Sequence, residues 1–412
     1  MVGTGLTDQA GREARPPRPV LMIVHSYYDE DPRVRREAEA VVASGRPAMV
    51  IGLRRPGESA DGELAGVRIR RLDVQRHQGA SLWRYLAEYA DFLVRAGWMA
   101  ARLHRRERFA VVQVASLPDY LVFAALPLRL VGVPVILDLH EAMPEFFRSR
   151  FPKASNPVAH RLLLIQERLS IAFASATLVV NEAMRDRLVG LGVAADKVSV
   201  VINSPSLGRF DLTAHPRRTF RADGPLRLIY TGGLTPTYEV DVAIRAVASI
   251  TAERPDLGVT FDVYGRGDSE PGLRALAAEL GIAERVVFHG RIPIDDVPAA
   301  VAGADIGIAP TRRDPFTDLS LSTKVYEYAA MGKPVVATRL PLVERTFPEG
   351  SVSTYEPGDA ASMAAAIVAF VDDPPAREAA VAQTMSIVRD AAWESGAASY
   401  IALVSRLADS RR

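Results

Sequence analysis

Residues 319–338 read Leu319-Ser-Leu-Ser-Thr-Lys324-Val-Tyr-Glu327-Tyr-Ala-Ala-Met-Gly332-Lys-Pro334-Val-Val-Ala-Thr338. The pattern predicts a polar loop that opens a helix, a helix end at Gly332, and a buried strand after Pro334. Lys324 and Glu327 are three residues apart, so their side chains share one face of the first helical turn. A cation beside free backbone N–H groups suits a diphosphate, and a carboxylate one turn later suits sugar hydroxyls. The stretch has the outline of a nucleotide-sugar site.

The length and composition of the chain suit a two-domain enzyme. Its 412 residues are enough for two α/β domains, which would supply a cleft between them. With 48% hydrophobic and 24% charged residues it has the composition of a globular protein, and no apolar run approaches the length of a membrane span. Residues 1–18 are polar and lack an apolar centre, so we expect a disordered tail, no secretory signal and a cytosolic location.

The charge and the cysteine content of the chain limit the kinds of site and of partner that it can have. The chain has no cysteine, which excludes disulfides, thiolate metal sites and a cysteine nucleophile. The net charge of +1 hides a basic first half, in which arginines cluster at 54–55, 68–76 and 102–108. Such clusters suit peripheral contact with the inner face of a membrane or an anionic acceptor, and a solvated helix face is the alternative. We expect no nucleic-acid partner.

Short apolar runs alternate with helical patterns along the chain, which predicts parallel sheets covered on both faces. The predicted strands are 20–24, 48–51, 110–114, 133–137, 177–180 and 198–202, and then 226–230, 259–263, 285–288, 305–309 and 334–337. We therefore predict two Rossmann-like α/β domains whose parallel sheets face each other across a cleft. The first spans 19–207, a linker spans 208–224, the second spans 225–390, and a C-terminal helix at 391–412 could return to the first domain.

Ligands of open parallel sheets bind beyond the carboxyl ends of the strands, so the loops there are the candidates for chemistry. In the second half, Gly232 and Gly233 would let a phosphate approach the backbone, and Arg266 follows the next strand between two glycines. Ordinary turn chemistry explains either loop equally well. The three-glycine spacing of a dinucleotide site is missing, which disfavours a nicotinamide-dependent enzyme.

The first half offers two further groups of polar residues. Tyr28, Asp29 and Arg33 follow the first strand, and we assign them to the acceptor side of the cleft. His140 and Glu141 follow a later strand, where a histidine can hydrogen-bond a sugar hydroxyl or stabilise developing charge. A histidine satisfied by local backbone is the alternative.

Taken together, the order and spacing of these motifs resemble glycosyltransferase family 4, a group of retaining GT-B enzymes, from about Val20 to about Tyr400. Besides the stretch at 319–338, the matching segments are 31–40, 138–141, 200–203, 230–234, 285–290 and 304–310. The resemblance implies that Glu327 binds the ribose hydroxyls of the donor and that His140 lies beside the transferred sugar. We take His140, Glu141 and Lys324 as catalytic candidates. The donor-binding set is Gly232, Gly233, Arg266, Arg291, Ile292, Ser322, Thr323, Lys324 and Glu327.

Within that set, the resemblance implies three kinds of contact with the donor. The glycine turn would lie under the diphosphate, together with the amides near Ser322 and Thr323. Arg291 and Ile292 would contact the base.

The chain departs from the family pattern in two places. Many members carry two glutamates separated by seven residues, but the earlier position here is Leu319, so that contact is absent or comes from another group such as Asp314 or Asp318. Many members also carry an Arg and a Lys after the two glycines, where this chain has no cation. We predict that Lys324 compensates, with Arg266 or Arg313, because an unneutralised leaving diphosphate raises the barrier.

The expected reaction is transfer of a sugar from a nucleotide-diphosphate sugar of UDP or GDP type. No Asp-x-Asp motif stands at a suitable strand end, so we expect no metal and no resident cofactor. The resemblance implies retention of anomeric configuration. The acceptor stays open among a glycan, a lipid-linked saccharide and a small molecule. Two rival functions are a GT-B nucleotide-sugar epimerase and a non-catalytic nucleotide-sugar-binding subunit of a transferase.

Overall fold

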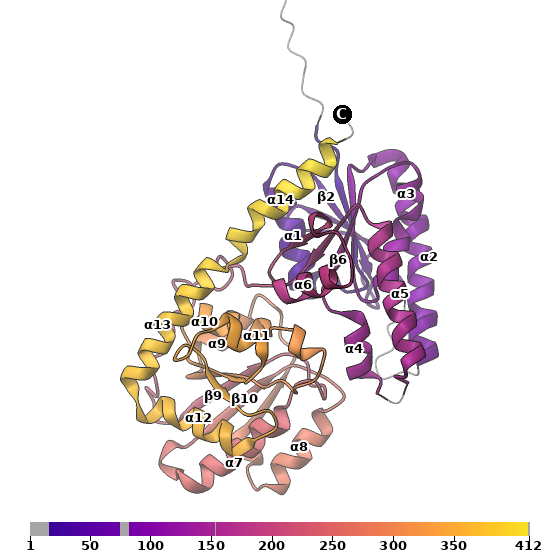
Figure 1. The fold of residues 1–412 in the computed structure, drawn as a ribbon. Coiled ribbons are helices and arrows are strands. Elements are labelled where there is room, and N and C mark those ends of the chain that lie inside the picture. The colour runs from indigo at the N-terminus through magenta and orange to yellow at the C-terminus, as the bar shows by residue number, and fades with distance from the viewer. Residues whose placement is uncertain (1–15, 75–81, 153, 411–412) are drawn as a thin grey trace, which may run out of the picture.

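The computed structural model of the chain describes residues 16–74, 82–152 and 154–410, which form two α/β domains (Figure 1). Each domain is built around one sheet, and the sheets have eight and six strands. The predicted architecture and all eleven predicted strands are confirmed. Most of the predicted N-terminal tail, up to residue 15, lies outside the described residues. None of the described helices combines the length and the apolar character that crossing a bilayer requires.

The first domain has a sheet in the order β3-β4-β2-β1-β5-β6-β7-β8. Its strands are β1 Val20–Ile23, β2 Ala48–Leu53, β3 Asp61–Leu64, β4 Val67–Leu72, β5 Val111–Ala115, β6 Val135–Leu139, β7 Ala176–Val179 and β8 Val198–Val200. Its helices are α1 Pro32–Ala43, α2 Leu82–Glu107, α3 Leu126–Leu130, α4 Met143–Arg150, α5 Pro157–Phe173 and α6 Glu182–Gly190, with short 3-10 helices η1 Tyr28–Glu30, η2 Asp119–Ala125 and η3 Ala195–Lys197. All neighbouring strands are parallel except β3 and β4.

The sequence prediction missed the β3–β4 hairpin, and the reason lies in its composition. Strand β4 alternates buried Val67 and Ile69 with half-buried arginines, so it lacks the continuous apolar run of the central strands. Strand β3 is an exposed antiparallel edge with charged residues. The arginines at 68–71 are therefore strand residues of a half-exposed sheet edge.

The second domain has a parallel sheet in the order β11-β10-β9-β12-β13-β14. Its strands are β9 Arg227–Thr231, β10 Thr260–Tyr264, β11 Val286–Gly290, β12 Ile306–Ala309, β13 Val335–Thr338 and β14 Ser353–Tyr355. Its helices are α7 Val240–Glu253, α8 Glu270–Glu279, α9 Val297–Ala302, α10 Thr323–Ala330, α11 Pro341–Thr346, α12 Ala360–Asp372 and α13 Pro374–Asp390, with 3-10 helices η4 Pro255–Leu257, η5 Ala283–Arg285 and η6 Thr317–Leu319. The short strand β14 was not predicted.

The chain passes between the domains twice. Val201 belongs to the core of the first domain and Phe210 to that of the second, so the first crossing lies between these residues. Helix α13 packs on α10 and α12 of the second domain, whereas α14 (Trp393–Asp409) packs on α1 and β5 of the first. Figure 1 shows these two helices running along one side of both domains. The buried Tyr400 hydroxyl donates a hydrogen bond to Gln113 of β5 at 2.8 Å.

Candidate functional site

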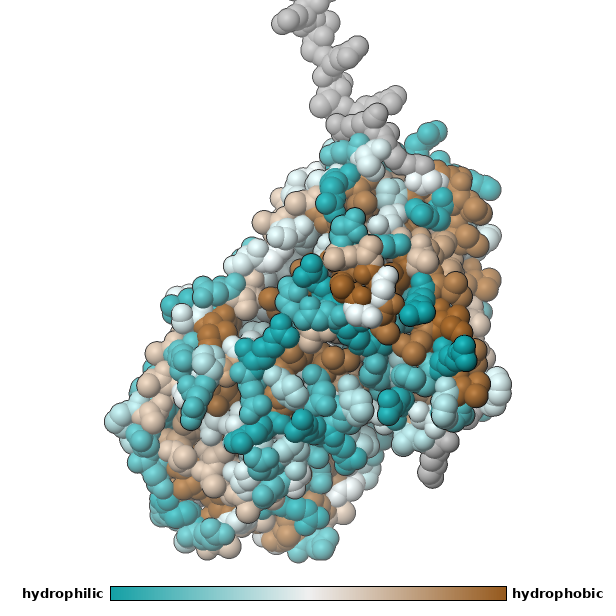
Figure 2. Space-filling model, in the orientation of Figure 1, coloured by the Kyte–Doolittle hydropathy of each residue, from teal (hydrophilic) through white to brown (hydrophobic). Residues whose placement is uncertain are grey.

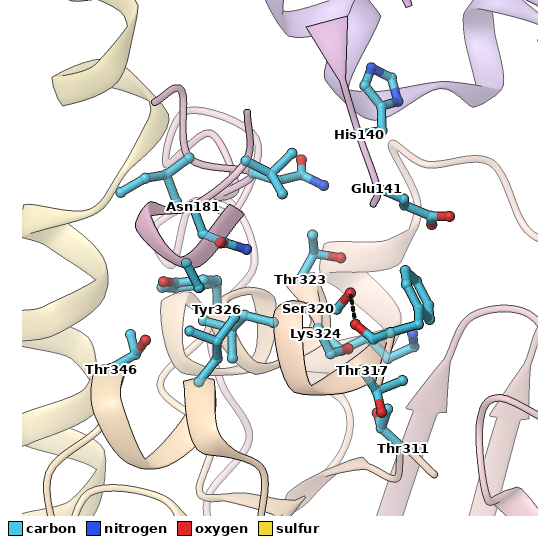
Figure 3. Close-up of a pocket in the computed structure, with 18 of the residues that line it drawn as sticks. His140, Glu141, Asn181, Thr311, Thr317, Ser320, Thr323, Lys324, Tyr326 and Thr346 are labelled. Carbon is cyan, nitrogen blue, oxygen red and sulfur yellow. Dashed lines mark hydrogen bonds between the residues drawn. The ribbon is translucent and has the colours of Figure 1, made fainter. Parts of the chain in front are cut away.

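Two cavities lie where the domains face each other. The Glu327 cavity measures about 570 Å³, and its wall includes Glu30, Arg36, Arg209, Gly232, Gly233, Tyr264, Arg266, Arg291, Ile292, Thr323, Lys324 and Glu327. The His140 cavity measures about 420 Å³, and its wall includes His140, Glu141, Asn181, Thr237, Tyr238, Thr311, Thr317, Ser320, Ser322, Thr323, Lys324 and Tyr326. Most of the predicted site residues line one cavity or the other. Figure 3 shows residues that line the His140 cavity, with His140 and Glu141 on one side and Ser320, Lys324 and Thr311 of the second domain on the other.

The two cavities share Thr323 and Lys324, the first two residues of α10. Within the described part of the chain, the backbone N–H groups of these residues have no hydrogen-bond acceptor. Free N–H groups at a helix N-terminus attract anions. The junction of the cavities is therefore suited to an anionic group that extends into both.

Lys324 is buried at this junction, with 7% of its surface exposed. Its Nζ lies 3.9 Å from the ring centroid of Tyr238 and 5.3 Å from that of Tyr230, which are cation–π distances. No carboxylate of the described residues lies within ion-pair distance of Nζ. Burial lowers the pKa of Lys324 to about 8, although Glu327 opposes this shift. The ammonium group thus rests on aromatic rings and remains available to an external anion.

The glycine turn after β9 packs directly on this lysine. A Cβ atom on Gly232, whose φ is +153°, would lie 2.3 Å from Cε and 2.7 Å from Nζ of Lys324. A Cβ atom on Gly265 would lie 1.7 Å from the carbonyl oxygen of Gly232. The Tyr328 hydroxyl of α10 accepts a hydrogen bond of 2.9 Å from the Thr231 N–H. Glycine at these positions therefore allows two strand-end loops and the helix to meet.

The Glu327 cavity contains two cations that the sequence analysis did not single out, Arg36 of α1 and Arg209 between the domains. Both stabilise the carboxylate of Glu327, whose pKa is nevertheless raised by burial. Arg36 is 6% exposed, donates from Nη2 to Asn203 at 2.6 Å, and has no described partner for its Nε. Arg209 pairs through Nε with Asp295 at 3.1 Å. Arg36 and Arg209 thus bring positive charge to the Glu327 cavity from outside the strand loops of the second domain.

Arg266, Arg291 and Ile292 also line the Glu327 cavity. The exposed Arg266 forms no ion pair with the described residues. Arg291 pairs with Glu30 of the first domain at 2.5 Å. Since both residues line the Glu327 cavity, this contact joins the two domains at its wall.

His140 is held by a buried network of the first domain. Its Nε2 lies 2.9 Å from Oδ2 of Asp138, and Arg33 donates from Nε and Nη2 to the same carboxylate. Burial opposes ionisation of Asp138, but Arg33 and His140 outweigh it and hold its pKa below the usual range. For His140 burial likewise opposes protonation, yet Asp138 raises the pKa of the ring. The ring is therefore fixed in place by Asp138.

Glu141 lines the His140 cavity and is the candidate acid–base group there. Its Oε2 is buried and has no hydrogen-bond partner in the described residues. Burial raises the pKa of Glu141 to about 7, against the effect of His140. An unpartnered carboxyl group with this pKa is typical of a functional position.

The structure corrects the acceptor-side assignment of Tyr28, Asp29 and Arg33, since none of them lines either cavity. Tyr28 is a core residue at 3% exposure, and Asp29 pairs with Arg55 at 3.0 Å on the surface. Arg33 is 2% exposed, and its guanidinium group pairs with Asp138 and Glu37 and donates a hydrogen bond to the Val201 carbonyl. All three follow the first strand in the sequence, but Tyr28 and Arg33 are buried inside the domain and Asp29 pairs with Arg55 outside both cavities.

Asp314 and Asp318, which were suggested as replacements for the glutamate missing at Leu319, also bind other groups. Asp314 caps the turn at Phe316 and accepts from Ser149 of the first domain at 2.6 Å. Asp318 pairs with Arg313 at 3.2 Å, and neither residue lines a cavity. Arg313 is thereby removed from the predicted phosphate ligands as well. Glu141 is the buried carboxyl group that the His140 cavity offers instead.

Further contacts hold the domains together around the cavities. Asp295 of the second domain accepts from Arg35 of α1 at 3.0 Å as well as from Arg209. The Asn181 side chain donates to the Leu319 carbonyl at 3.0 Å. The described residues contain no cluster of three or more potential metal ligands.

Family models match both halves of the chain. Residues 31–204 match the model described as "Glycosyl transferase 4-like domain", and residues 225–373 match "Glycosyl transferases group 1". Between them the two models account for most of the chain. Residues 205–224, which neither match covers, include part of the segment where the chain passes between the domains.

Among curated proteins, the glycogen synthase of Mycobacterium tuberculosis is 24% identical over 88% of this chain and 87% of its own length. The D-inositol 3-phosphate glycosyltransferase of Thermobispora bispora is 28% identical over 65% of this chain and 64% of its own length.

Solved structures share the fold. Sucrose-phosphate synthase of Thermosynechococcus elongatus superposes with a TM-score of 0.76 at 18% identity, covering 95% of this chain and 99% of that one. The Anabaena protein HepE, solved with UDP, superposes with a TM-score of 0.66 at 16% identity, covering 94% and 99%. Both family models name glycosyl transferases, and the two α/β domains are as the sequence resemblance implied. The chain therefore belongs to the family 4 type of GT-B glycosyltransferases, enzymes that act on nucleotide sugars.

Proposed function

We propose that this enzyme transfers the sugar of a UDP- or GDP-sugar to an acceptor held against the first domain, with retention of anomeric configuration and without a metal ion. The observation that carries this proposal is the meeting of the two cavities at Thr323 and Lys324. A nucleotide in the Glu327 cavity and a sugar in the His140 cavity would place the diphosphate between them at the N-terminus of α10.

The nucleotide end of the donor finds suitable partners in the Glu327 cavity. Glu327 has the carboxylate needed to accept hydrogen bonds from two ribose hydroxyls. Arg291 and Ile292 line the same cavity, where we assign them to the base. HepE, which has a similar fold, has been solved with UDP and with UDP-glucose, and this favours a uridine nucleotide.

The diphosphate leaving group would be stabilised by protein cations. Lys324 lies at the cavity junction, and Arg36 and Arg209 line the Glu327 cavity. Charge that develops on the leaving oxygen interacts strongly with such groups in a site from which water is excluded. This supply of cations is the reason to propose transfer without a metal.

The transferred sugar would lie in the His140 cavity, with the acceptor approaching from the first domain. His140 would contact a sugar hydroxyl, and Glu141 would take the place of the carboxylate missing at Leu319. Retention requires attack on the face that the diphosphate leaves. We infer an ion-pair-like transition state, in which the departing diphosphate accepts the proton of the acceptor hydroxyl and no side chain becomes glycosylated.

The test is a panel of UDP- and GDP-sugars incubated with sugar, polyol and lipid-linked saccharide acceptors, with products detected by mass spectrometry. Proton NMR coupling constants of the new glycoside report retention, and excess EDTA should leave the rate unchanged. Lys324→Ala should lower kcat by about 100-fold or more. The matched control Arg313→Gln removes a cation that is paired with Asp318 outside the cavities.

The rival functions give different results in the same experiment. A nucleotide-sugar epimerase would convert the donor in the absence of any acceptor. A non-catalytic subunit would bind donor, seen as a thermal shift, yet form no glycoside with any acceptor. Inversion at the anomeric carbon, or loss of activity with EDTA, would contradict the mechanism while leaving the transferase assignment intact.

A further inference from the structure

The outer face of the first domain is unusually apolar. Of the fourteen exposed large hydrophobic side chains in the described residues, eleven lie on α2, α3 and α5 or directly after α3. Figure 2 shows brown surface along the edge of the molecule where Figure 1 places these helices. We call this the α2–α5 face and define it by Trp83, Leu86, Val94, Trp98, Leu126, Leu130, Val158, Leu162, Ile165 and Leu169.

The exposed residues follow helical spacing, so they form stripes and not scattered positions. On α5, Val158, Leu162, Ile165 and Leu169 recur at intervals of three and four residues. The opposite side of α2 is buried in the core of the domain through Phe92, so this helix is apolar on two faces. Folding does not require an apolar stripe on the solvent side of a helix. Exposed apolar patches of this kind mark surfaces that bind a partner.

The tryptophans point to the kind of partner. Trp83 is 79% exposed and Trp98 is 63% exposed, whereas Trp393, the third in the chain, is buried. Tryptophan combines a large apolar ring with an N–H group and is favoured where a protein meets the headgroup layer of a membrane.

The charges on the α2–α5 face that lack an oppositely charged partner are positive. Each carboxylate on α2, α3 and α5 is already paired: Glu88 with His25, Asp91 with Arg95, Glu107 with Arg68 and Glu167 with Arg187. The exposed arginines that have no carboxylate partner among the described residues are Arg84, Arg102, Arg105, Arg106, Arg129, Arg161 and Arg168. The face therefore presents apolar side chains among uncompensated positive charges.

We propose that the α2–α5 face docks on an anionic lipid bilayer. The apolar side chains would enter the interface between headgroups and acyl chains, and the arginines would pair with lipid phosphates. A second copy of this chain is a poorer partner, because a two-fold dimer through this face would bring like charges together. This inference concerns a different surface from the cavities and does not depend on the proposed sugar transfer.

The test uses the full chain and vesicles of phosphatidylcholine mixed equally with phosphatidylglycerol, against vesicles of phosphatidylcholine alone. Co-sedimentation should show binding to the anionic vesicles that weakens at high salt. Tryptophan emission should shift to shorter wavelength on binding, since the two exposed tryptophans lie on the face. Trp83→Ser with Trp98→Ser, and separately Arg105→Glu with Arg106→Glu, should each lower the partition coefficient by about tenfold or more.

Matched controls come from the second domain. Val287→Ser removes an exposed apolar side chain, and Arg245→Glu reverses an exposed charge on α7, both away from the face. Both should bind vesicles like the parent, and thermal melting should show that every variant is folded. The proposal is overturned if the parent does not bind anionic vesicles, or if the tryptophan pair binds unchanged. It is also overturned if sedimentation velocity finds a dimer that the same pair dissolves while vesicle binding is absent.

Discussion

Replacing Gly232 with alanine should disable the enzyme through Lys324. The new Cβ atom would stand 2.3 Å from Cε of the lysine, whereas unstrained carbon atoms approach to about 3.5–4.0 Å. The lysine must therefore move by about 1 Å or more, and the backbone φ of +153° adds strain of about 1–3 kcal/mol for a residue with a side chain. A displacement of this size at a charge-stabilising group costs about 100-fold in kcat, or roughly 2.7 kcal/mol of barrier.

The assay measures kcat and kcat/KM with the best donor and acceptor for four proteins: the parent, Gly232→Ala, Lys324→Ala and the double variant. If the alanine acts by displacing the lysine, the double variant should be no slower than Lys324→Ala alone. Thermal melting separates this effect from simple loss of fold.

Gly233→Ala provides the comparison, because its Cβ atom would meet only Tyr238 and Thr235, at 3.8 and 3.9 Å. The family resemblance treats both glycines alike, as backbone under the diphosphate, whereas the packing makes only Gly232 a steric neighbour of the lysine. Equal losses for the two single variants would refute the packing argument in favour of close ligand approach. So would a folded Gly232→Ala enzyme with turnover within about threefold of the parent.

Three other perturbations have defined outcomes. Because the pKa of Lys324 is lowered to about 8 and its protonated form is needed, kcat/KM should fall as pH rises through about 8, and Lys324→Ala should lack this alkaline decline. Arg36→Gln should raise the donor KM by about tenfold or more, whereas Arg313→Gln should not, as measured by initial rates over a donor series. Arg33→Met leaves buried Asp138 without its cation and should lower the free energy of unfolding in urea by about 3–5 kcal/mol. The control for Arg33→Met is Arg274→Met, which breaks a pair whose arginine is 54% exposed and should lower the free energy of unfolding by less than about 1 kcal/mol.

Much of the fold could be predicted because its central strands are continuous apolar runs. Strands such as β1 and β13 are buried on both faces, so their sequences carry the signal directly. The β3–β4 hairpin was not predicted because buried and exposed residues alternate along an edge strand. Its arginines have the same sequence pattern as a cluster of surface charges. Strand β14 was not predicted because its three residues are too few to show a hydrophobic periodicity.

Many of the residues that line the Glu327 cavity could be predicted for a related reason, since they follow strands in sequence order. The loops at Gly232, Arg266 and Arg291 and the start of α10 all reach the Glu327 cavity. Arg36 could not be distinguished from Arg33 and Arg35 in the same helix. Which of the three faces the cavity depends on how α1 packs against Asp138 and Asn203, more than 100 residues later in the sequence.

The positions of the three cations have a consequence for when chemistry can occur. Arg36 belongs to the first domain, Arg209 to the segment between the domains and Lys324 to the second, yet all three act on Glu327. The diphosphate of a donor bound to the second domain alone would meet Lys324 and the amides of α10 but would lack Arg36 and Arg209. Closure of the cleft, held by Asp295 between Arg35 and Arg209, would add the remaining charge. Leaving-group stabilisation would then be complete only when the acceptor side is also in place, which favours transfer over hydrolysis of the donor.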